Sequence, residues 1–274
     1  MEEKTHAALR RRRQTSPRRR SRILAALVLA GLALWGVLEW QTPAPPEPGV
    51  TVSEESLTRS EPFYRYQAPG VTALAGVDVS GYQGSIDWTA VKAAGADFAM
   101  VRVGFRGYGT GALVEDECFA QNAADAAAAG LTVGAYFYSQ AVTEEEAAEE
   151  AQFVTERLRN TDVSGPVAYD LEFYTADEAR TDHLTGEQAT RNALAFCRVI
   201  REAGYEPVVY MNLHWAGSMY GMEELADLPV WLAAYDALPA LNRGITLWQY
   251  SESGTVDGIG GPVDLDLWFI KERA

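Results

Sequence analysis

Cysteine and histidine are scarce in this chain of 274 residues. Its two cysteines, Cys118 and Cys197, are too few for a disulfide-built scaffold and show no paired metal-ligand spacing. Only three histidines are present and no HExxH motif occurs, so the sequence argues against a zinc enzyme. We expect both thiols to be free and no metal site.

Basic residues are also sparse outside the first 22 positions. Residues 1–22 contain nine basic and two acidic side chains, whereas the rest of the chain has 14 basic and 36 acidic ones, a net charge of −22. Nucleic acid binding depends on neutralising phosphates with Lys and Arg. The charge therefore excludes nucleic acid as a partner of the main body.

One long apolar run follows the basic cluster. Ile23 to Leu38 are sixteen apolar residues, closed by Glu39 and Trp40. As a helix they would reach about 24 Å, slightly less than a hydrocarbon core of about 30 Å. We expect a basic cytoplasmic tail (1–22) and a transmembrane signal anchor (23–40), which would leave the rest of the chain outside the cell membrane. The alternative is a cleaved signal peptide and a secreted protein.

Proline dominates the next segment, residues 41–70, which has few residues that could form a core. Such a composition is typical of a stiff, extended linker. We expect it to hold the following domain away from the lipid surface. The six prolines are Pro43, Pro45, Pro46, Pro48, Pro62 and Pro69.

Residues 71–274 alternate between strand-like and helix-like patterns. Thr143 with Glu146 and Thr185 with Gln188 have the spacing of helix-capping boxes. A short fifth helix is expected near residues 223–226. The eight expected strands are 76–80, 98–104, 132–139, 166–172, 207–212, 230–235, 245–251 and 263–269.

The spacing of these elements predicts an α/β fold with five βα units followed by three further strands. The gaps at 236–244 and 252–262 are too short for helical crossovers, which favours antiparallel pairing among the last three strands. Eight strands of this kind predict an irregular barrel that resembles a TIM barrel but departs from its regular eightfold repeat.

Two acids end the fourth strand. Asp170 and Glu172 alternate with Leu171, so their side chains point to one face with Cα atoms about 6.6 Å apart. Two buried carboxyl groups so close cannot both ionise freely, and one of them could donate a proton near neutral pH. Paired acids are the usual equipment for cleaving glycosidic bonds. The alternative is that they cap a loop or bind a structural ion.

Two more acids lie in apolar strands, where a charge is costly unless it is paired or used. Asp78 ends the first strand, whereas Asp264 begins the eighth and reaches the same rim only if that strand starts there. Many aromatic residues of these strands are expected in the core. Those at strand ends, with two amides, are candidate sugar-binding residues: Tyr138, Tyr210, Asn212, Trp215, Tyr235, Trp248 and Gln249.

An ordered set of segments resembles glycoside hydrolase family 25, the muramidases of the Chalaropsis and Cellosyl type. Relatives often have Tyr-His-Phe where this chain has Tyr136-Phe137-Tyr138, so the resemblance gives no role to a histidine there. The segments are GVDVSGYQGSIDW (76–88), AYDLE (168–172), GYEPVVYMN (204–212), LPVWLAAY (228–235), LWQYS (247–251) and VDLD (263–266).

The resemblance implies a family 25 catalytic domain at 71–274, with five βα units and three further strands. It implies hydrolysis of the β-1,4 bond between N-acetylmuramic acid and N-acetylglucosamine in peptidoglycan, without a cofactor. Glu172 matches the proton donor and Asp170 its partner, and Asp78 and Asp264 match two further acids of the groove. We expect a monomer whose partners are peptidoglycan glycan strands and the membrane.

Two other functions remain open at this point. A wall-binding module could keep the same fold without turnover, although the presence of all four acids argues against it. A chitinase-like barrel would predict a longer acidic run before the catalytic glutamate. Only Asp170 and Glu172 occur in residues 165–172.

Overall fold

The computed structural model describes residues 49–174, 176–235 and 237–272. The expected cytoplasmic tail (1–22), the expected membrane anchor (23–40) and the first part of the expected linker (41–48) lie outside the described residues. Within the described ranges, none of the helices has the length and apolar character needed to span a bilayer.

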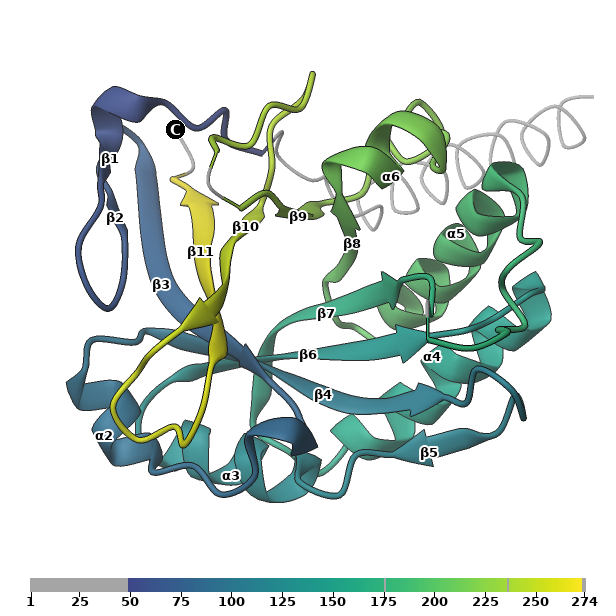
Figure 1. The fold of residues 1–274 in the computed structure, drawn as a ribbon, viewed down its shortest axis with the longest axis horizontal. Coiled ribbons are helices and arrows are strands. Elements are labelled where there is room, and N and C mark those ends of the chain that lie inside the picture. The colour runs from purple at the N-terminus through teal and green to yellow at the C-terminus, as the bar shows by residue number, and fades with distance from the viewer. Residues whose placement is uncertain (1–48, 175, 236, 273–274) are drawn as a thin grey trace, which may run out of the picture. The chain divides into compact units, whose positions relative to one another are not determined.

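A closed sheet forms the body of the fold (Figure 1). Each strand is hydrogen-bonded to its neighbours around the ring, and β3 pairs with β4 to close it. Phe98, Met100, Val208 and Leu247 are buried in one apolar cluster with Trp231. The ring runs in the order β3 (Val71–Val79), β11 (Val263–Lys271), β10 (Leu247–Gly254), β9 (Val230–Ala233), β8 (Pro207–Asn212), β7 (Val163–Leu171), β6 (Thr132–Ser139) and β4 (Phe98–Arg106).

Five βα units precede three further strands, as the sequence predicts. The fifth helix lies at Leu213–Ser218 rather than near residues 223–226, because the side chain of Asn212 at the end of β8 caps it at once. A short strand that the sequence did not predict, β5 (Leu113–Glu115), pairs with the end of β4. The α-helices of the described residues are α2 (Trp88–Ala93), α3 (Phe119–Ala128), α4 (Glu144–Leu158), α5 (Gly186–Glu202) and α6 (Leu213–Ser218).

The helices begin where local chemistry favours them. Thr143 and Thr185 each accept a hydrogen bond from the backbone N–H three residues later, so both predicted N-caps are present. The reciprocal half of the first capping box is shifted, because the Glu146 carboxylate accepts from the N–H of Val142 instead. The apolar stripe of α5 is buried, and α4 and α5 pack side by side (Figure 1).

Strand direction decides which ends meet at one rim. All neighbours from β3 through β4, β6, β7, β8, β9 and β10 are parallel, whereas β11 is antiparallel to both β10 and β3. The expected antiparallel pairing is therefore confirmed for β11. β9 and β10 are parallel, which requires the chain to cross back from the end of β9 to the start of β10. The thirteen residues between Ala233 and Leu247 are long enough for this crossover.

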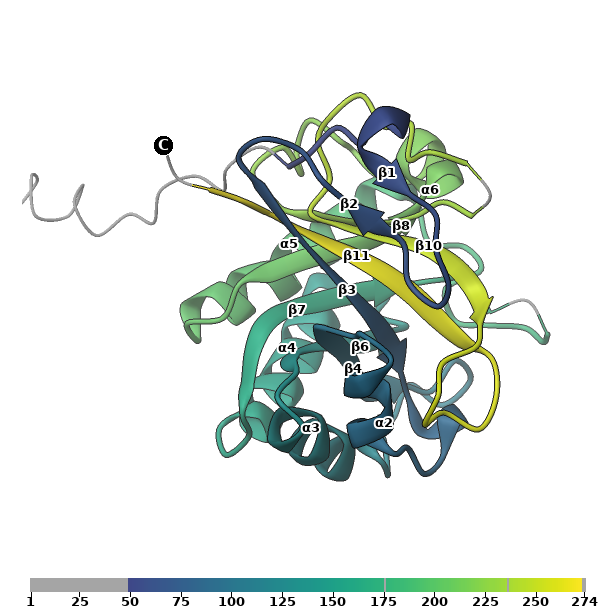
Figure 2. The same cartoon turned by 90° about the vertical axis from the view of Figure 1, so that its left-hand side faces the viewer.

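Residues 49–70 do not form an extended linker, and this corrects the sequence-based prediction. They form a strap, which we name the N-terminal strap, with the short strands β1 (Leu57–Thr58) and β2 (Arg65–Tyr66) beside β3 and β11 (Figure 2). Val50 exchanges two backbone hydrogen bonds with Ile245, and the Phe63 side chain is only 1% exposed. The ring of Tyr64 stacks on Tyr250 of β10 at 4.2 Å.

The N-terminal strap packs on the barrel because it covers apolar surface that none of the described helices covers. No helix follows β9, β10 or β11 in the described chain, so the outer faces of these strands need another cover. Phe63 and Tyr66 supply the apolar surface that a helix provides elsewhere, and Tyr66 meets Phe269 of β11 edge to face. Residues 49–70 thus belong to the packed domain, which does not begin at residue 71.

Candidate active site

A cavity of about 340 Å³ opens at the rim where the parallel strands end. Five acidic side chains line it, whereas Arg102 is the one basic residue among the lining residues. A site that gathers like charges in a partly buried volume raises their proton affinity. The acids are Asp78, Asp170, Glu172, Glu252 and Asp264.

Asp170 and Glu172 face the same cavity, as their alternation predicts. Asp170 is the next-to-last residue of β7 and lies opposite Tyr138 of β6, so the barrel wall fixes its position. Glu172 is the first residue past the strand and is only half-buried, whereas Asp170 is buried. Glu172 is therefore the member of the pair that a substrate reaches more easily.

Burial raises the pKa of both carboxyl groups. The pKa of Asp170 lies well above its usual range, mainly through burial and then through the charge of Glu172, while the nearby Arg102 guanidinium acts in the opposite direction. Burial also raises the pKa of Glu172, and the neighbouring Tyr210 hydroxyl partly offsets that rise. Near neutral pH the pair therefore retains a proton that can be transferred.

Asp78 and Asp264 meet across two strands. They are directly paired residues of β3 and β11, so the antiparallel start of β11 does bring Asp264 to the rim. Burial and the charge of Asp78 raise the pKa of Asp264 to about 8, and burial raises that of Asp78 well above its usual range. The amide of Gln249 donates to Asp78 Oδ2 at 2.8 Å.

A third carboxyl group lies below this pair. Asp266 is fully buried, accepts a hydrogen bond from Trp231 Nε1 at 2.8 Å and has a pKa raised well above its usual range by burial. Sequence reasoning singled out Asp264 alone. Asp266 follows Asp264 by two strand positions and therefore shares its face, which is the signal that could have found it.

Three predicted substrate-binding hydroxyls and one amide come together in the cavity. The hydroxyls of Tyr210 and Tyr235 both donate to Gln249 Oε1, at 3.0 and 2.7 Å. With its amide on Asp78, Gln249 has a fixed orientation. Tyr138 lines the same cavity and is the neighbour of Asp170 across the strands.

Three other predicted substrate-binding residues do not line this cavity. Asn212 caps α6 by accepting from the N–H of Trp215, and Trp215 is buried against Phe173 and Tyr220. Trp248 is 2% exposed and lies on the outer face of β10, where it meets Tyr64 of the strap. The proposed flat sugar-binding surfaces at Trp215 and Trp248 are therefore corrected to packing residues.

Several further residues that line the cavity were not predicted from the sequence. Arg102 forms an ion pair with Asp116 at 2.8 Å, and its guanidinium lies 5.1 Å from the centre of the Tyr82 ring. Tyr82 is 88% exposed and presents a flat face at the cavity. An arginine within an apolar strand of an otherwise acidic chain was the signal that could have found Arg102. Ser80, Gln83, Tyr136, Trp231 and Glu252 complete the residues that were missed.

A larger cavity of about 600 Å³ lies elsewhere and is lined by Gly49, Met222 and Leu241 among others. It contains no pair of acids, so its size does not make it the site of acid chemistry. Among the described residues, no group of three or more His, Cys, Asp or Glu side chains is arranged to hold a metal ion. Both cysteines, Cys118 and Cys197, are free thiols.

The sequence of this domain matches a known protein family. The model of the glycosyl hydrolases family 25 matches residues 77–259, more than half of the chain. The chain belongs to glycosyl hydrolase family 25. In this family 25 domain, the match runs from β3 to just before β11 and so includes Asp78, Asp170 and Glu172.

Individual relatives agree with the family. The domain is similar to lysozyme M1 of Streptomyces globisporus, with 29% identity over 265 residues and 88% of each chain covered. It resembles the solved bacterial lysozyme of Streptomyces coelicolor with a TM-score of 0.58 and 25% identity, covering 71% of this chain and 91% of that one. A family 25 glycosyl hydrolase from Bacillus anthracis shares the fold, with a TM-score of 0.59, 21% identity and coverage of 79% and 94%.

Proposed function

We propose that this family 25 glycoside hydrolase is a peptidoglycan N-acetylmuramidase, a lysozyme that cleaves the β-1,4 bond between N-acetylmuramic acid and N-acetylglucosamine. The observation that carries the proposal is the placement of Asp170 and Glu172 in one open cavity, both with raised pKa values. Similarity to lysozymes supports this choice of substrate.

Glu172 acts as the general acid in this mechanism. Its carboxyl group is the more accessible of the pair, and it donates its proton to the glycosidic oxygen as the bond to the departing sugar breaks. The neighbouring Tyr210 hydroxyl lowers the pKa of this carboxyl group and so favours the carboxylate that remains. Tyr82, with its exposed ring, supplies an apolar face for a sugar.

Asp170 stabilises the positive charge that develops on the muramic acid ring. Among the described residues its Oδ1 atom is buried without a hydrogen-bond partner, so it can accept from the substrate. An N-acetyl sugar offers an amide N–H, and orienting that group as the internal nucleophile is one of two routes open to Asp170. The other route is direct attack by the Asp170 carboxylate on the anomeric carbon.

Digestion of purified peptidoglycan tests the proposed function. After reduction with borohydride, mass spectrometry identifies the sugar at each new reducing end, and we expect muramic acid. Release of glucosamine ends would instead indicate a different bond specificity. The absence of any released fragment would contradict the proposal and support a wall-binding module.

We further propose that residues 23–40 anchor the enzyme in the cell membrane with the catalytic domain outside. The apolar run after a basic cluster supports this location, and signal cleavage with secretion is the alternative. Fractionation of cells that express the full chain, followed by determination of its N-terminal residue, separates the two. A chain that begins at Met1 in the membrane fraction supports the anchor, and a shortened chain in the medium contradicts it.

A further inference from the structure

The backbone of Glu172 lies just beyond the reach of the sheet. The β6–β7 ladder ends at the pair Ser139 and Leu171, so no ladder partner remains for the Glu172 carbonyl. The side chain of Gln140 takes that place, because its Nε2 donates to Glu172 O at 2.8 Å. A side-chain amide thus adds one more hydrogen bond between the two strands.

Gln140 is itself held in place. It is completely buried, and Thr181 Oγ1 donates to its Oε1 at 2.8 Å, so both ends of the amide are paired. The Glu150 carboxylate, whose pKa the backbone of Gln140 lowers, accepts a hydrogen bond from the adjacent Ser139 hydroxyl at 2.6 Å. Both ends of the Gln140 amide and the hydroxyl of the preceding Ser139 therefore have specific partners.

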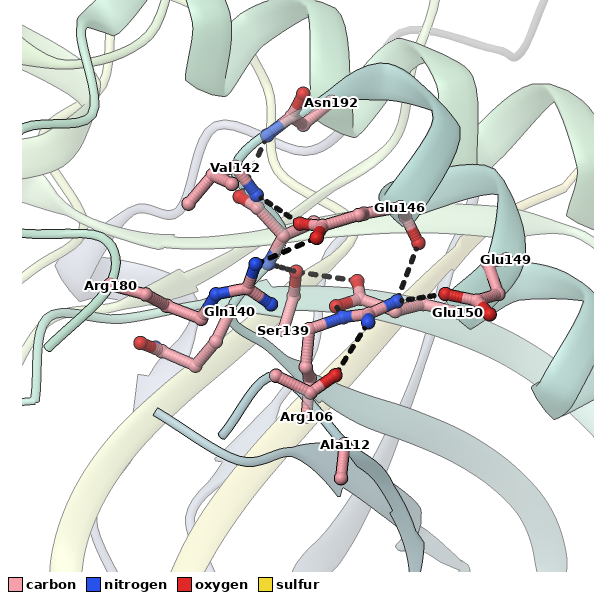
Figure 3. Close-up of polar contacts among 12 residues, drawn as sticks. Arg106, Ala112, Ser139, Gln140, Val142, Glu146, Glu149, Glu150, Arg180 and Asn192 are labelled. Carbon is pink, nitrogen blue, oxygen red and sulfur yellow. Dashed lines mark hydrogen bonds and ion pairs between the residues drawn. The ribbon is translucent and has the colours of Figure 1, made fainter. Parts of the chain in front are cut away.

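A buried ion pair on α4 supports this arrangement (Figure 3). Arg106 of β4 donates to Glu150 Oε1 at 2.7 Å, and both side chains are buried. The Arg106 guanidinium also reaches Gly111 O and Glu146 O, at 2.8 and 3.0 Å. Gln140 consequently stands on the rigid junction of β4, β6 and α4 rather than on a loose loop.

We propose that Gln140 is a positioning residue for Glu172: its amide fixes the main chain of the proton donor where the β6–β7 ladder stops. The inference rests on the proposed function of Glu172. Without this bond the chain between Leu171 and Thr181 could rotate at Glu172, and the carboxyl group would leave its place beside Asp170. Proton donation depends on placement within about an ångström.

The expected consequences concern turnover more than binding. Gln140 does not line the cavity, so sugar contacts remain. A displaced Glu172 would be more hydrated, and its raised pKa would move towards its ordinary value. The alkaline limb of the kcat profile should then shift to lower pH. The groups that face Glu172 and stay unchanged are Tyr138, Asp170, Tyr210, Tyr220, Glu252 and Asp264.

Two variants and one control test the proposal on the full chain. Gln140→Met and Gln140→Leu both keep roughly the volume of the side chain and remove the donor towards Glu172. Thr181→Val is the control, because it removes the other hydrogen bond of Gln140 and leaves the bond to Glu172. Activity on peptidoglycan is measured from pH 4 to 9, at temperatures at least 15 °C below each Tm.

We expect both Gln140 variants to lose about 10- to 100-fold in kcat with KM within twofold, and to shift the alkaline limb to lower pH. Thr181→Val should keep its pH profile and most of its kcat even where its Tm falls. An unchanged pH profile in either folded Gln140 variant, or an equal loss in Thr181→Val, would overturn the proposal. An inactive wild-type enzyme would refute the proposed function instead.

Discussion

Asp78 and Asp264 lie directly opposite each other on β3 and β11, although 186 positions separate them in the chain. Their pairing places the beginning of one strand at the end of another, which only an antiparallel neighbour allows. Through this pair, β3 and β11 contribute two acids to the same cavity that Asp170 and Glu172 line. The geometry of the site therefore depends on the one strand that departs from the parallel order.

Replacing Glu172 by glutamine should abolish hydrolysis. Glutamine has nearly the same shape but cannot donate a carboxyl proton, so we expect kcat to fall by about 10² to 10⁴. The measurement is the release of reducing ends from peptidoglycan, with circular dichroism to verify the fold. Glu178→Gln, an exposed acid of the following loop, is the matched control and should keep full activity.

Asp264 should make stability dependent on pH. Its pKa is raised to about 8 in the folded protein, above the ordinary value of 3.8, so the folded state binds this proton more tightly. The associated stability is fully present below about pH 4 and is lost as pH rises through 8. Asp264→Asn cannot ionise, so its Tm should fall less between pH 4 and pH 8.

Calorimetry over that range checks the Asp264 prediction. Asp257→Asn, at an exposed position of the β10–β11 connection, serves as the comparison and should follow the wild-type curve. A Tm profile of Asp264→Asn that runs parallel to the wild-type profile would show that the ionisation of Asp264 does not cost stability.

Tyr82 and Trp248 should separate binding from packing. Tyr82 is exposed at the cavity, so Tyr82→Ala should raise KM by up to about tenfold with little change in Tm. Trp248 is buried and donates to Ala234 O at 2.9 Å, so Trp248→Phe should lower stability by about 1–3 kcal/mol with KM unchanged. Steady-state kinetics and denaturant unfolding of both variants check this, and a reversed pattern would restore Trp248 as a sugar-binding residue.

The buried ion pair of Arg106 and Glu150 should be costly to break. Arg106→Met leaves Glu150 without its charged partner in the core, and we expect a loss of about 3–5 kcal/mol in the free energy of unfolding. Arg191→Met removes an ion pair with the exposed Glu187 on the surface of α5 and should cost less than about 1 kcal/mol. Urea titrations measure the free energy of unfolding of both variants. Equal losses would show that breaking the buried ion pair costs no more than breaking the exposed one.

The N-terminal strap should be needed for a stable domain. A chain that starts at Gly49 should fold, whereas one that starts at Val71 exposes the surface that Phe63 and Tyr66 cover and should aggregate or unfold. Within the full chain, Phe63→Ala should cost about 3–5 kcal/mol. Gln67→Ala, at an exposed position of the same strap, is the control. Equal Tm values for the two shortened chains would show that the strap is dispensable.

Much of the fold followed from local patterns. Alternation along β7 placed Asp170 and Glu172 on one face, and capping threonines marked where α4 and α5 begin. The same alternation could have separated Gln249 from Trp248, because adjacent residues of one strand cannot both face the cavity. The strap was missed because a proline-rich composition resembles that of a linker, while the surface that needed a cover belongs to strands some 180 positions later.

The sequence by itself determined the repeating units, the acid pair and the family, because these depend on neighbours within a few residues or on ordered motifs. Only the tertiary structure decided that Asp78, Asp264 and Asp266 form one cluster, that Gln140 holds the carbonyl of Glu172, and that Trp248 lies under the strap. These contacts join residues far apart in the chain. Their energies depend on strand direction and burial, which exist only once the barrel has closed.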